Sequence, residues 1–198
     1  MKSHFFAYIA RMRYITRWAL MRNTEPENIQ EHSHMVAILA HALALLQNKH
    51  FGGHIDPGQA VLLALYHDAT EILTGDLPTP IKYYNPALRA SYKEVEETAA
   101  NRLLELLPEE LRGDYAPYLL HPDPELEAVV KAADKLDAYL KCVKERKAGN
   151  GEFQTAQVQI WDALQANPLP ALGYFIQHYL PSFELTLDQL NGSTHTMF

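Results

Sequence analysis

The segment IQEHSHMVAILAHALALLQ, residues 29–47, decides the fold class of this chain. Apolar residues occur on almost every face of a helix built from it, so we predict a central, buried helix. Its longest nearly apolar run covers 12 residues from Met35 to Leu46 and contains His41. Such a run is too short to span a bilayer. We therefore expect a core helix and no membrane partner.

Capping residues predict further helices after this segment. Three pairs place a capping side chain directly before a proline at the first helical position: Asp56-Pro57, Asn85-Pro86 and Asp123-Pro124. After the second pair, apolar residues recur at three- and four-residue steps as far as Pro108, and after the third they continue nearly to Gly149. Another helix is predicted between Phe153 and Pro168, and Ser3 is expected to cap a short first helix.

The remaining sequence adds neither a strand nor a domain boundary. No stretch alternates between apolar and polar residues as a half-buried strand would. No internal repeat and no Gly/Ser linker divides the chain. We therefore expect an all-α fold with one domain over residues 1–198, a bundle of about seven to nine helices with a peripheral tail after about residue 188.

Composition excludes several functional classes. The 198 residues are 47% hydrophobic and 21% charged, as in an ordinary folded protein. Seventeen Lys and Arg against 24 Asp and Glu give a net charge of −7, so no nucleic acid polymer is expected as a partner. The single cysteine, Cys142, excludes an internal disulfide and a cysteine-rich zinc module. The first ten residues do not resemble a secretion signal, and we expect a cytoplasmic protein.

Four positions are candidate metal ligands: His32 in the segment above, the adjacent pair His67-Asp68, and Asp134. Imidazole and carboxylate together suit divalent transition ions such as Co2+, Mn2+, Zn2+, Fe2+, Ni2+ or Cu2+. Adjacent helical residues point about 100° apart, so His67 and Asp68 can share an ion only near a helix end. The helix that carries them is expected to end near Ala69. A buried carboxylate such as Asp134 needs an ion or an arginine beside it.

The residues alone leave alternatives open. A single histidine on an apolar helix is more often a hydrogen-bonded core residue than a ligand, and a His-Asp pair arises by chance in many proteins. His34 lies about 200° around the helix from His32, so the two cannot face one site. Asp137, one turn after Asp134, offers a second carboxylate, and spacing does not choose between them. The informative feature is the order H, HD, D on three predicted helices.

That ordered set resembles the HD-domain metal-dependent phosphohydrolases. Longer stretches are similar to the bacterial 5′-deoxynucleotidases, which remove phosphate from deoxyribonucleoside 5′-monophosphates. The similarity covers nearly the whole chain to about residue 188, and these stretches carry it: Phe5-Phe6-Ala7, Arg17-Trp18-Ala19-Leu20-Met21-Arg22, Glu31-His32-Ser33, Tyr66-His67-Asp68-Ala69-Thr70-Glu71, Leu73-Thr74-Gly75-Asp76-Leu77-Pro78-Thr79-Pro80 and Ala138-Tyr139-Leu140-Lys141-Cys142.

The resemblance implies a role for each matching residue and a homodimer for the assembly. By this match the metal ligands are His32, His67, Asp68 and Asp134, so Asp134 is selected over Asp137. Catalysis would use Glu71 as the acid near the attacking water and Arg17 to orient the phosphate. Contacts with the nucleotide would come from Arg17, Trp18, Asp76, Leu77, Pro78 and Thr79.

General chemistry supports these roles without the family. Phosphate monoester hydrolysis is extremely slow unaided, and a divalent ion both neutralises charge and activates water. Glu71 follows Asp68 by three residues, which places both on one side of a continuing helical turn. Arg17 supplies two parallel donors for a phosphate. The competing interpretations are a solvated helix-end acid, a surface salt bridge for Arg17, a core tryptophan at Trp18, and a merely rigid turn at the prolines after Asp76.

The sequence therefore predicts an enzyme: a metal-dependent phosphomonoester hydrolase, specifically a 5′-deoxynucleotidase whose small-molecule partner is a 2′-deoxyribonucleoside 5′-monophosphate. A first alternative is another HD phosphohydrolase that acts on nucleoside triphosphates or a guanosine alarmone. A second is a non-catalytic nucleotide-binding helical protein that retains a metal site. The intact ligand set together with Glu71 favours the enzyme over this last class.

Overall fold

The computed structural model describes residues 3–78 and 85–192, and within these ranges the chain is helical apart from its connections. The helices follow in this order: α1 Phe5–Ile9, η1 Ala10–Tyr14, α2 Ile29–Phe51, α3 Pro57–Tyr66, α4 Glu71–Thr74, α6 Pro86–Glu105, α7 Glu109–Leu119, α8 Pro124–Lys147, η2 Gly151–Phe153, α9 Gln154–Gln165, α10 Pro170–His178, η3 Leu180–Glu184 and α11 Leu187–Leu190. The prediction of an all-α bundle is confirmed. Among the described residues, no helix is long and apolar enough to cross a membrane.

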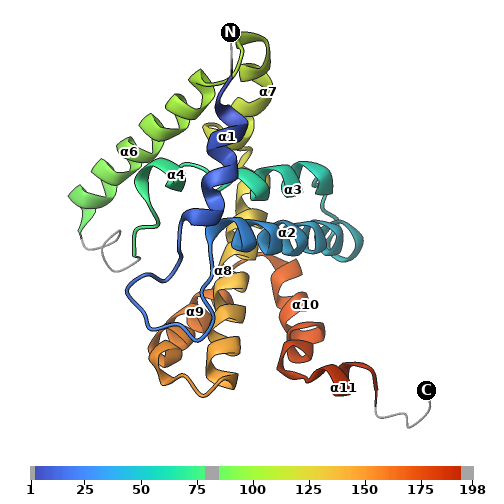
Figure 1. Ribbon diagram of the computed structural model, residues 1–198. Helices are drawn as coiled ribbons and strands as arrows, with labels where there is room; N and C mark the ends of the chain where they lie inside the picture. Colours follow the sequence, from blue (N-terminus) through green and yellow to red (C-terminus); the bar gives the residue numbers. More distant parts are fainter. Residues whose placement is uncertain (1–2, 79–84, 193–198) are drawn as a thin grey trace.

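Helix α2 is the centre of the bundle, with α3, α8 and α10 packed against it (Figure 1). Asn28 begins it through a capping box with Glu31, and Gly52 ends it in the left-handed conformation at φ 68°. Small and aliphatic side chains of α2, α3 and α8 form the main hydrophobic core. This packing brings the first turn of α2, the end of α3 and the middle of α8 to one place.

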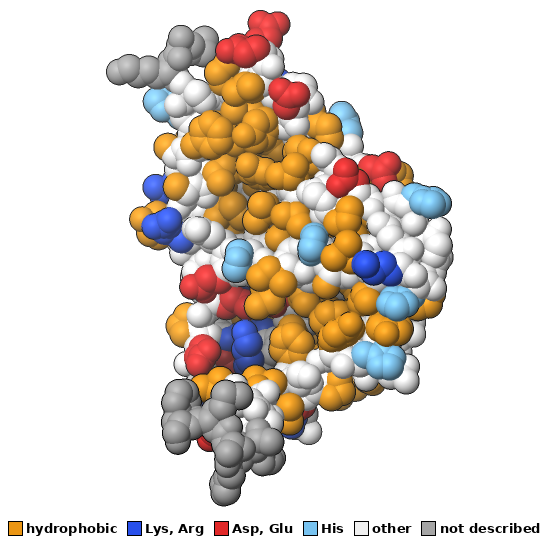
Figure 2. Space-filling view, turned by 90° about the vertical axis from the view of Figure 1, so that its right-hand side faces the viewer, with side chains coloured by type: hydrophobic (Ala, Val, Ile, Leu, Met, Phe, Trp, Pro, Cys, Tyr) orange, Lys and Arg blue, Asp and Glu red, His pale blue; other side chains and the backbone are white. Residues whose placement is uncertain are grey.

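One face of α2 departs from the expectation of a fully buried helix. His34, Ile38 and His41 share this face and are exposed, with Ile38 49% accessible. Hydrophobic side chains with histidines between them gather on one face of the molecule, shown in Figure 2. The other faces of α2 pack against three helices. The helix is therefore only weakly amphipathic, with a single exposed face.

A second cluster joins α1 to α6 and α7, centred on the buried Phe5 and Leu103. The prediction that Ser3 caps the first helix is confirmed in part. The residue directly before the helix is His4, which makes no side-chain cap bond, but Ser3 Oγ accepts a hydrogen bond from the backbone N of Phe5 at 3.4 Å. The Ser3 hydroxyl also donates to the carbonyl of Leu106 at 2.7 Å, because the end of α6 lies beside the N-terminal segment. Tertiary proximity offered an acceptor that local sequence does not show.

Helix α8 carries polar side chains into the core. Its start is capped by Asp123 ahead of Pro124, as predicted. Three of its buried residues are charged and follow one another at four-residue steps: Asp137, Lys141 and Glu145, each 3% exposed or less. Four-residue steps place side chains on one helix face. That face is turned toward the segment that connects η1 to α2, because Glu145 bonds the backbone of Thr24 within it.

Candidate metal and nucleotide site

The end of α3 supplies two of the predicted ligands. His67 is the residue that closes this helix, and Asp68 opens the turn that leads to α4. The helix therefore ends just where the sequence required it to end for adjacent side chains to share an ion. His67 Nδ1 donates to the carbonyl of Ala64 at 2.7 Å, which turns its Nε2 toward Asp68, 3.3 Å from Oδ2.

His32 reaches the same place from the first turn of α2. Its Nε2 lies 3.1 Å from Asp134 Oδ1 and 3.5 Å from Asp68 Oδ2. Its Nδ1 donates to Asp137 Oδ2 at 2.7 Å. The two acids of α8 that spacing alone could not separate thus lie on opposite sides of one imidazole, with Asp134 on the side of His67 and Asp68. His34 is exposed and takes no part.

Together these residues fit a divalent metal ion. Ligand atoms of His32, His67 and Asp68 lie within 4.8 Å of one another, and Asp134 joins the group through its proximity to His32. The Nε2 atoms of His32 and His67 are buried and make no hydrogen bond with any described residue. Buried polar atoms without partners are costly, and two imidazoles with carboxylates are a common donor set for transition ions. The geometry therefore suits a metal ion among these four residues.

Electrostatics of the metal-free cluster give the same indication. Burial alone would lower the pKa of His32, but the carboxylates of Asp134 and Asp137 raise it to about 9. Burial alone would raise the pKa of Asp134, but His32, with further help from His67 and Arg17, lowers it below its usual range. Without an ion, a proton on His32 compensates the carboxylates. A metal ion bound by Nε2 would take the place of that proton.

Arg17 lies next to this cluster, on the segment between η1 and α2. The backbone of that segment is closed by a bridge between Thr16 and Asn28 and by a bond from Arg17 N to Glu27 O at 2.9 Å. The guanidinium pairs with Glu27 at 2.5 Å and approaches Asp134 at 3.9 Å. Burial alone would lower the pKa of Arg17, but the surrounding carboxylates, Glu27 first, raise it. The Arg17 side chain is therefore charged and held in place by Glu27, and it is only 11% exposed. It does not form a surface salt bridge.

Trp18 adopts a backbone conformation that is uncommon for its residue type. Its φ is 58°, in the left-handed region that costs an L-residue about 1–2 kcal/mol. The Asp76 carboxylate accepts a hydrogen bond from Trp18 N at 3.3 Å. The indole ring lies 5.3 Å from the Phe153 ring, with Arg17 Cζ 5.9 Å away. Strained residues that the surroundings hold in place are often functional, and the contact with Asp76 brings two predicted substrate residues together.

Glu71 and the following loop complete the predicted set. Glu71 is the first residue of α4, and its backbone N donates to the carbonyl of Asp68 at 3.0 Å, which places it one turn from the cluster. Burial raises the pKa of Asp76, and the negative charge of Asp68 adds to this rise against the opposing charge of Arg17. Leu77 and Pro78 are half-buried beside it. Thr79 lies outside the described residues.

One contributor was not found from the sequence, and another was found in a different role. Glu27, which pairs with Arg17, was not singled out, and Asp137, which bonds His32, was considered only as an alternative metal ligand. For Asp137, its one-turn distance from Asp134 was the only signal. For Glu27 there was none, because its partner lies ten residues away across a loop.

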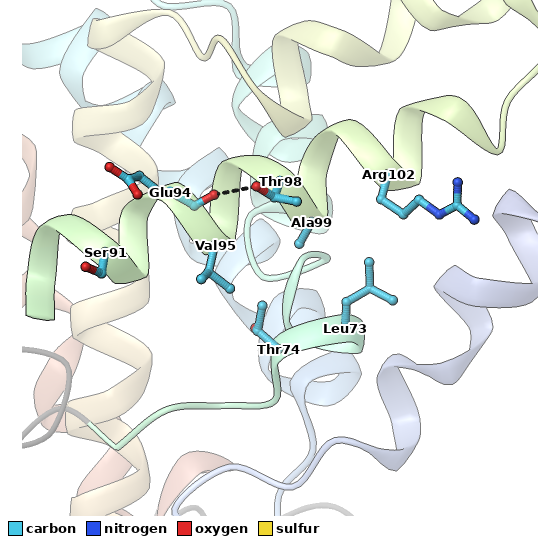
Figure 3. A pocket seen from close by; sticks show the side chains of 8 residues that line it. All are labelled: Leu73, Thr74, Ser91, Glu94, Val95, Thr98, Ala99 and Arg102. Atoms are coloured by element: carbon cyan, nitrogen blue, oxygen red, sulfur yellow. Dashed lines mark hydrogen bonds between the residues drawn. The ribbon is translucent and has the colours of Figure 1, made fainter.

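A hollow of about 520 Å³ lies between α4 and α6 and is separate from this cluster. Figure 3 shows Leu73 and Thr74 of α4 facing Val95 and Ala99 of α6. Its described lining includes none of the predicted site residues. The predicted chemistry is therefore placed at the His32 and His67 cluster and not in this hollow.

Solved structures share this fold and define its class. An HD-domain phosphohydrolase from Listeria innocua superposes with a TM-score of 0.79 at 22% identity, covering 91% of this chain and 88% of that one. The HD phosphohydrolase of cyanophage S-2L, bound to dA and one catalytic Zn2+ ion, superposes with a TM-score of 0.61 at 22% identity, covering 91% and 96%. The fold is that of the HD-domain phosphohydrolases.

Sequence comparison narrows the class to one family. A 5′-deoxynucleotidase of Vibrio parahaemolyticus is 52% identical over 192 residues, which are 96% of this chain and 99% of the relative. The family described as "5′-deoxynucleotidase YfbR-like" matches residues 4–183, and the chain belongs to it. The family expected from the sequence, and with it the class of metal-dependent phosphohydrolases, is confirmed.

Proposed function

We propose that this chain hydrolyses 2′-deoxyribonucleoside 5′-monophosphates to the deoxyribonucleoside and inorganic phosphate. The observation that carries the proposal is the convergence of two buried Nε2 atoms with two carboxylates beside a fixed arginine, in a chain of the 5′-deoxynucleotidase family. The dA bound to the cyanophage protein of the same fold supports a deoxynucleoside ligand.

In this proposal His32, His67, Asp68 and Asp134 hold the metal ion. A divalent ion held there would supply charge neutralisation at the phosphoryl group and activation of water for attack. Asp137 and the carbonyl of Ala64 hold the two imidazoles by their Nδ1 atoms, as outer partners of metal-binding histidines commonly do. These contacts support Nε2 as the ligand atom of both histidines.

The neighbouring residues act on the substrate. Glu71, one turn from Asp68, orients the attacking water and takes its proton. Arg17, held by Glu27, binds the phosphate and neutralises charge that develops on it. Trp18 and Asp76, joined by a hydrogen bond from the Trp18 backbone N to the Asp76 carboxylate, form with Leu77 and Pro78 the edge that contacts the sugar. The family resemblance adds Thr79 to this contact.

Finer features belong to the same proposal. The ion is a transition metal such as Co2+ or Mn2+, because imidazole ligands disfavour Mg2+. Residues 1–198 act as a single domain, in the cytoplasm and as a homodimer. The hydrophobic side chains that gather on the face shown in Figure 2 support association with a second copy, since large exposed apolar patches favour burial.

The test is a panel of phosphorylated nucleosides with released phosphate as the readout, with and without added metal. Hydrolysis of deoxyribonucleoside monophosphates that needs metal is expected. Preferential hydrolysis of triphosphates or of a guanosine alarmone would contradict the substrate, and no hydrolysis at all would contradict the enzyme.

A further inference from the structure

The buried polar face of α8 extends beyond the metal cluster. Asp137, at its beginning, contacts His32. Lys141 and Glu145 follow at four-residue steps, and their side chains are 4% and 1% exposed. The proposed chemistry uses neither of them, although Lys141 lies in one of the stretches that carry the family resemblance.

Glu145 gathers hydrogen-bond donors from three directions. Its carboxylate accepts from the backbone N of Thr24 at 2.9 Å and of Glu25 at 3.3 Å. It also accepts from Asn150 Nδ2 at 2.8 Å and from the Lys141 ammonium. These bonds, with burial opposing them, lower the pKa of Glu145 below its usual range. The carboxylate is therefore ionised and bound to the segment between η1 and α2.

Lys141 binds the same segment between η1 and α2 through a backbone carbonyl. Its Nζ donates to the carbonyl of Glu25 at 2.5 Å, so Glu25 is held by its N–H and by its C=O. Asn150, a partner of Glu145, also donates to the carbonyl of Arg22 at 2.8 Å. The backbone from Arg22 to Glu25 is thus fastened to α8 and the turn after it.

This fastening leads directly to Trp18. Asn23, inside the fastened stretch, donates from Nδ2 to the carbonyl of Trp18 at 3.2 Å. On its other side, Lys141 Nζ lies 5.4 Å from the Phe153 ring, and that ring lies 5.3 Å from the indole of Trp18. The ring of Trp18 is therefore connected to Lys141 through Phe153. Its backbone is connected to Glu145 through Asn23 and the adjoining Thr24.

A strained residue needs such support. Trp18 holds φ at 58°, and a left-handed L-residue relaxes unless its surroundings prevent it. A buried ion pair is a weak source of net stability compared with apolar residues of similar size. A carboxylate has several lone-pair sites, however, and can accept from two backbone N–H groups and two side chains at once. The pair is therefore better suited to fixing a loop than to stabilising the fold.

We propose that Lys141 and Glu145 are positioning residues that hold residues 18–25, the Trp18 loop, against the nucleotide. They thereby set the preference for deoxyribose over ribose. This inference rests on the proposed contact between Trp18 and the sugar. The pair acts on selectivity through Trp18 and touches neither the phosphate nor the reacting water. Loss of the pair frees the loop, so the sugar pocket widens while the metal ligands stay in place.

The experiment compares two substrates in one variant. Lys141→Met/Glu145→Leu, the charge-free pair variant, removes the loop contacts without leaving a buried unpaired charge. The exposed Thr24 and Glu25 can then bond to water. The expected result is a ratio of kcat/KM for deoxy- over ribonucleoside monophosphate at least about 10-fold narrower than in the unmodified protein, out of the roughly 10²-fold range for rejection of an extra hydroxyl. Bound metal per chain is unchanged.

The ratio separates positioning from damage to the fold. Both substrates meet the same active fraction, so partial unfolding cancels. Leu172→Ala is the matched control, because Leu172 is buried in α10 within the main core and its truncation leaves a destabilising cavity. This control is expected to lower stability and leave the ratio unchanged. A ratio that narrows equally in Leu172→Ala and the charge-free pair variant would overturn the inference.

A second comparison separates the inference from the proposed function. Adding the Lys141→Met/Glu145→Leu changes to Trp18→Ala is expected to narrow the ratio no further than Trp18→Ala does by itself, because the pair acts only through the Trp18 ring. If Trp18→Ala narrows the ratio but the charge-free pair variant does not, the positioning inference is wrong. If Trp18→Ala has no effect by itself, the proposed sugar contact is wrong.

A direct optical readout is available because the chain has two tryptophans. In a Trp161→Phe background Trp18 is the only tryptophan, and excitation at a wavelength beyond tyrosine absorption makes it the only emitter. The charge-free pair variant is expected to shift Trp18 emission to longer wavelength and to increase quenching by acrylamide. Unchanged emission and quenching would show that the loop stays in place without the pair, and would overturn the inference.

Discussion

His32 Nδ1 lies 2.7 Å from Asp137 Oδ2, whereas His32 Nε2 lies 3.1 Å from Asp134 Oδ1. One imidazole thus divides two acids of the same helix into different roles. If an ion takes the lone pair of Nε2, the one proton of the neutral ring is on Nδ1 and is donated to Asp137, because a carboxylate only accepts. In the proposed site Asp134 is therefore a ligand, and Asp137 orients the His32 ring.

Metal content after dialysis distinguishes these two acids. Asp134→Ala is expected to lose the bound ion, because a ligand is removed. Asp137→Ala is expected to retain an ion but to bind it about 10–100-fold more weakly, the usual effect of losing an outer partner of a metal-binding histidine. His34→Ala, at an exposed position of the same helix as His32, is the control and is expected to match the unmodified protein. Loss of the ion in Asp137→Ala with retention in Asp134→Ala would reverse the assignment.

Chelation tests the requirement for metal. Excess chelator is expected to abolish phosphate release, and Mn2+ or Co2+ is expected to restore it better than Mg2+, because two imidazoles favour borderline transition ions over a hard, oxygen-seeking one. Phosphate release and metal analysis are measured on the same samples. Full activity in metal-free protein would refute the mechanism.

Substitutions of Glu71 and Arg17 are expected to affect different kinetic steps. Glu71→Ala retains metal and nucleotide binding but turns over at least about 10²-fold more slowly, since an acid/base group is lost. Arg17→Ala raises KM and lowers kcat together, because its charge meets the phosphate in both the ground state and the transition state. Steady-state kinetics on one deoxynucleotide separates the two. Small and equal effects would return both residues to ordinary surface or structural roles.

Trp18→Ala tests the sugar contact by itself. Removing the ring is expected to narrow the deoxy-to-ribo ratio of kcat/KM more than it lowers activity on the deoxy substrate, because the extra hydroxyl gains room. Paired deoxy- and ribonucleoside monophosphates with several bases are compared, and little dependence on the base is expected. An unchanged ratio would show that a residue other than Trp18 excludes the 2′-hydroxyl group.

Acid stability reports the Lys141–Glu145 pair. The folded pKa of Glu145 lies below the unfolded value of 4.5, so its contribution to stability is complete above about pH 4.5 and is lost as the pH falls toward the folded pKa. Between pH 6 and pH 3, the Tm of the charge-free pair variant is expected to fall by less than the Tm of the unmodified protein. Glu184→Gln, at an exposed ion pair with Arg146, is the control and is expected to keep the full dependence. Parallel Tm curves for all three proteins would contradict the prediction.

Local sequence was sufficient for the elements themselves. Asn-Pro and Asp-Pro pairs begin α3, α6 and α8 because capping and a preset φ act within one turn of chain. The near-continuous apolar stretch of α2 predicted the centre of the bundle for an equally local reason, since its side chains must be buried somewhere. The identity of the HD motif was likewise present in the order of four residues along the chain.

Only the tertiary structure decided which residues far apart in the sequence become partners and which role each of them takes. Asp134 and Asp137 are equivalent by spacing, and the family resemblance selects Asp134 as the ligand. Only the approach of α2 to α8 shows that Asp137 holds His32 from the side opposite Asp134. Ser3 and Glu27 have partners that no local rule names, because Leu106 O and the Arg17 guanidinium reach them through folding. The same holds for Lys141 and Glu145, whose four-residue step predicts only a helix pair until the Thr24 and Glu25 backbone is packed against them. Helix caps and apolar faces are encoded within a turn or two of chain, whereas the partner of a buried charge is set by which helices pack together.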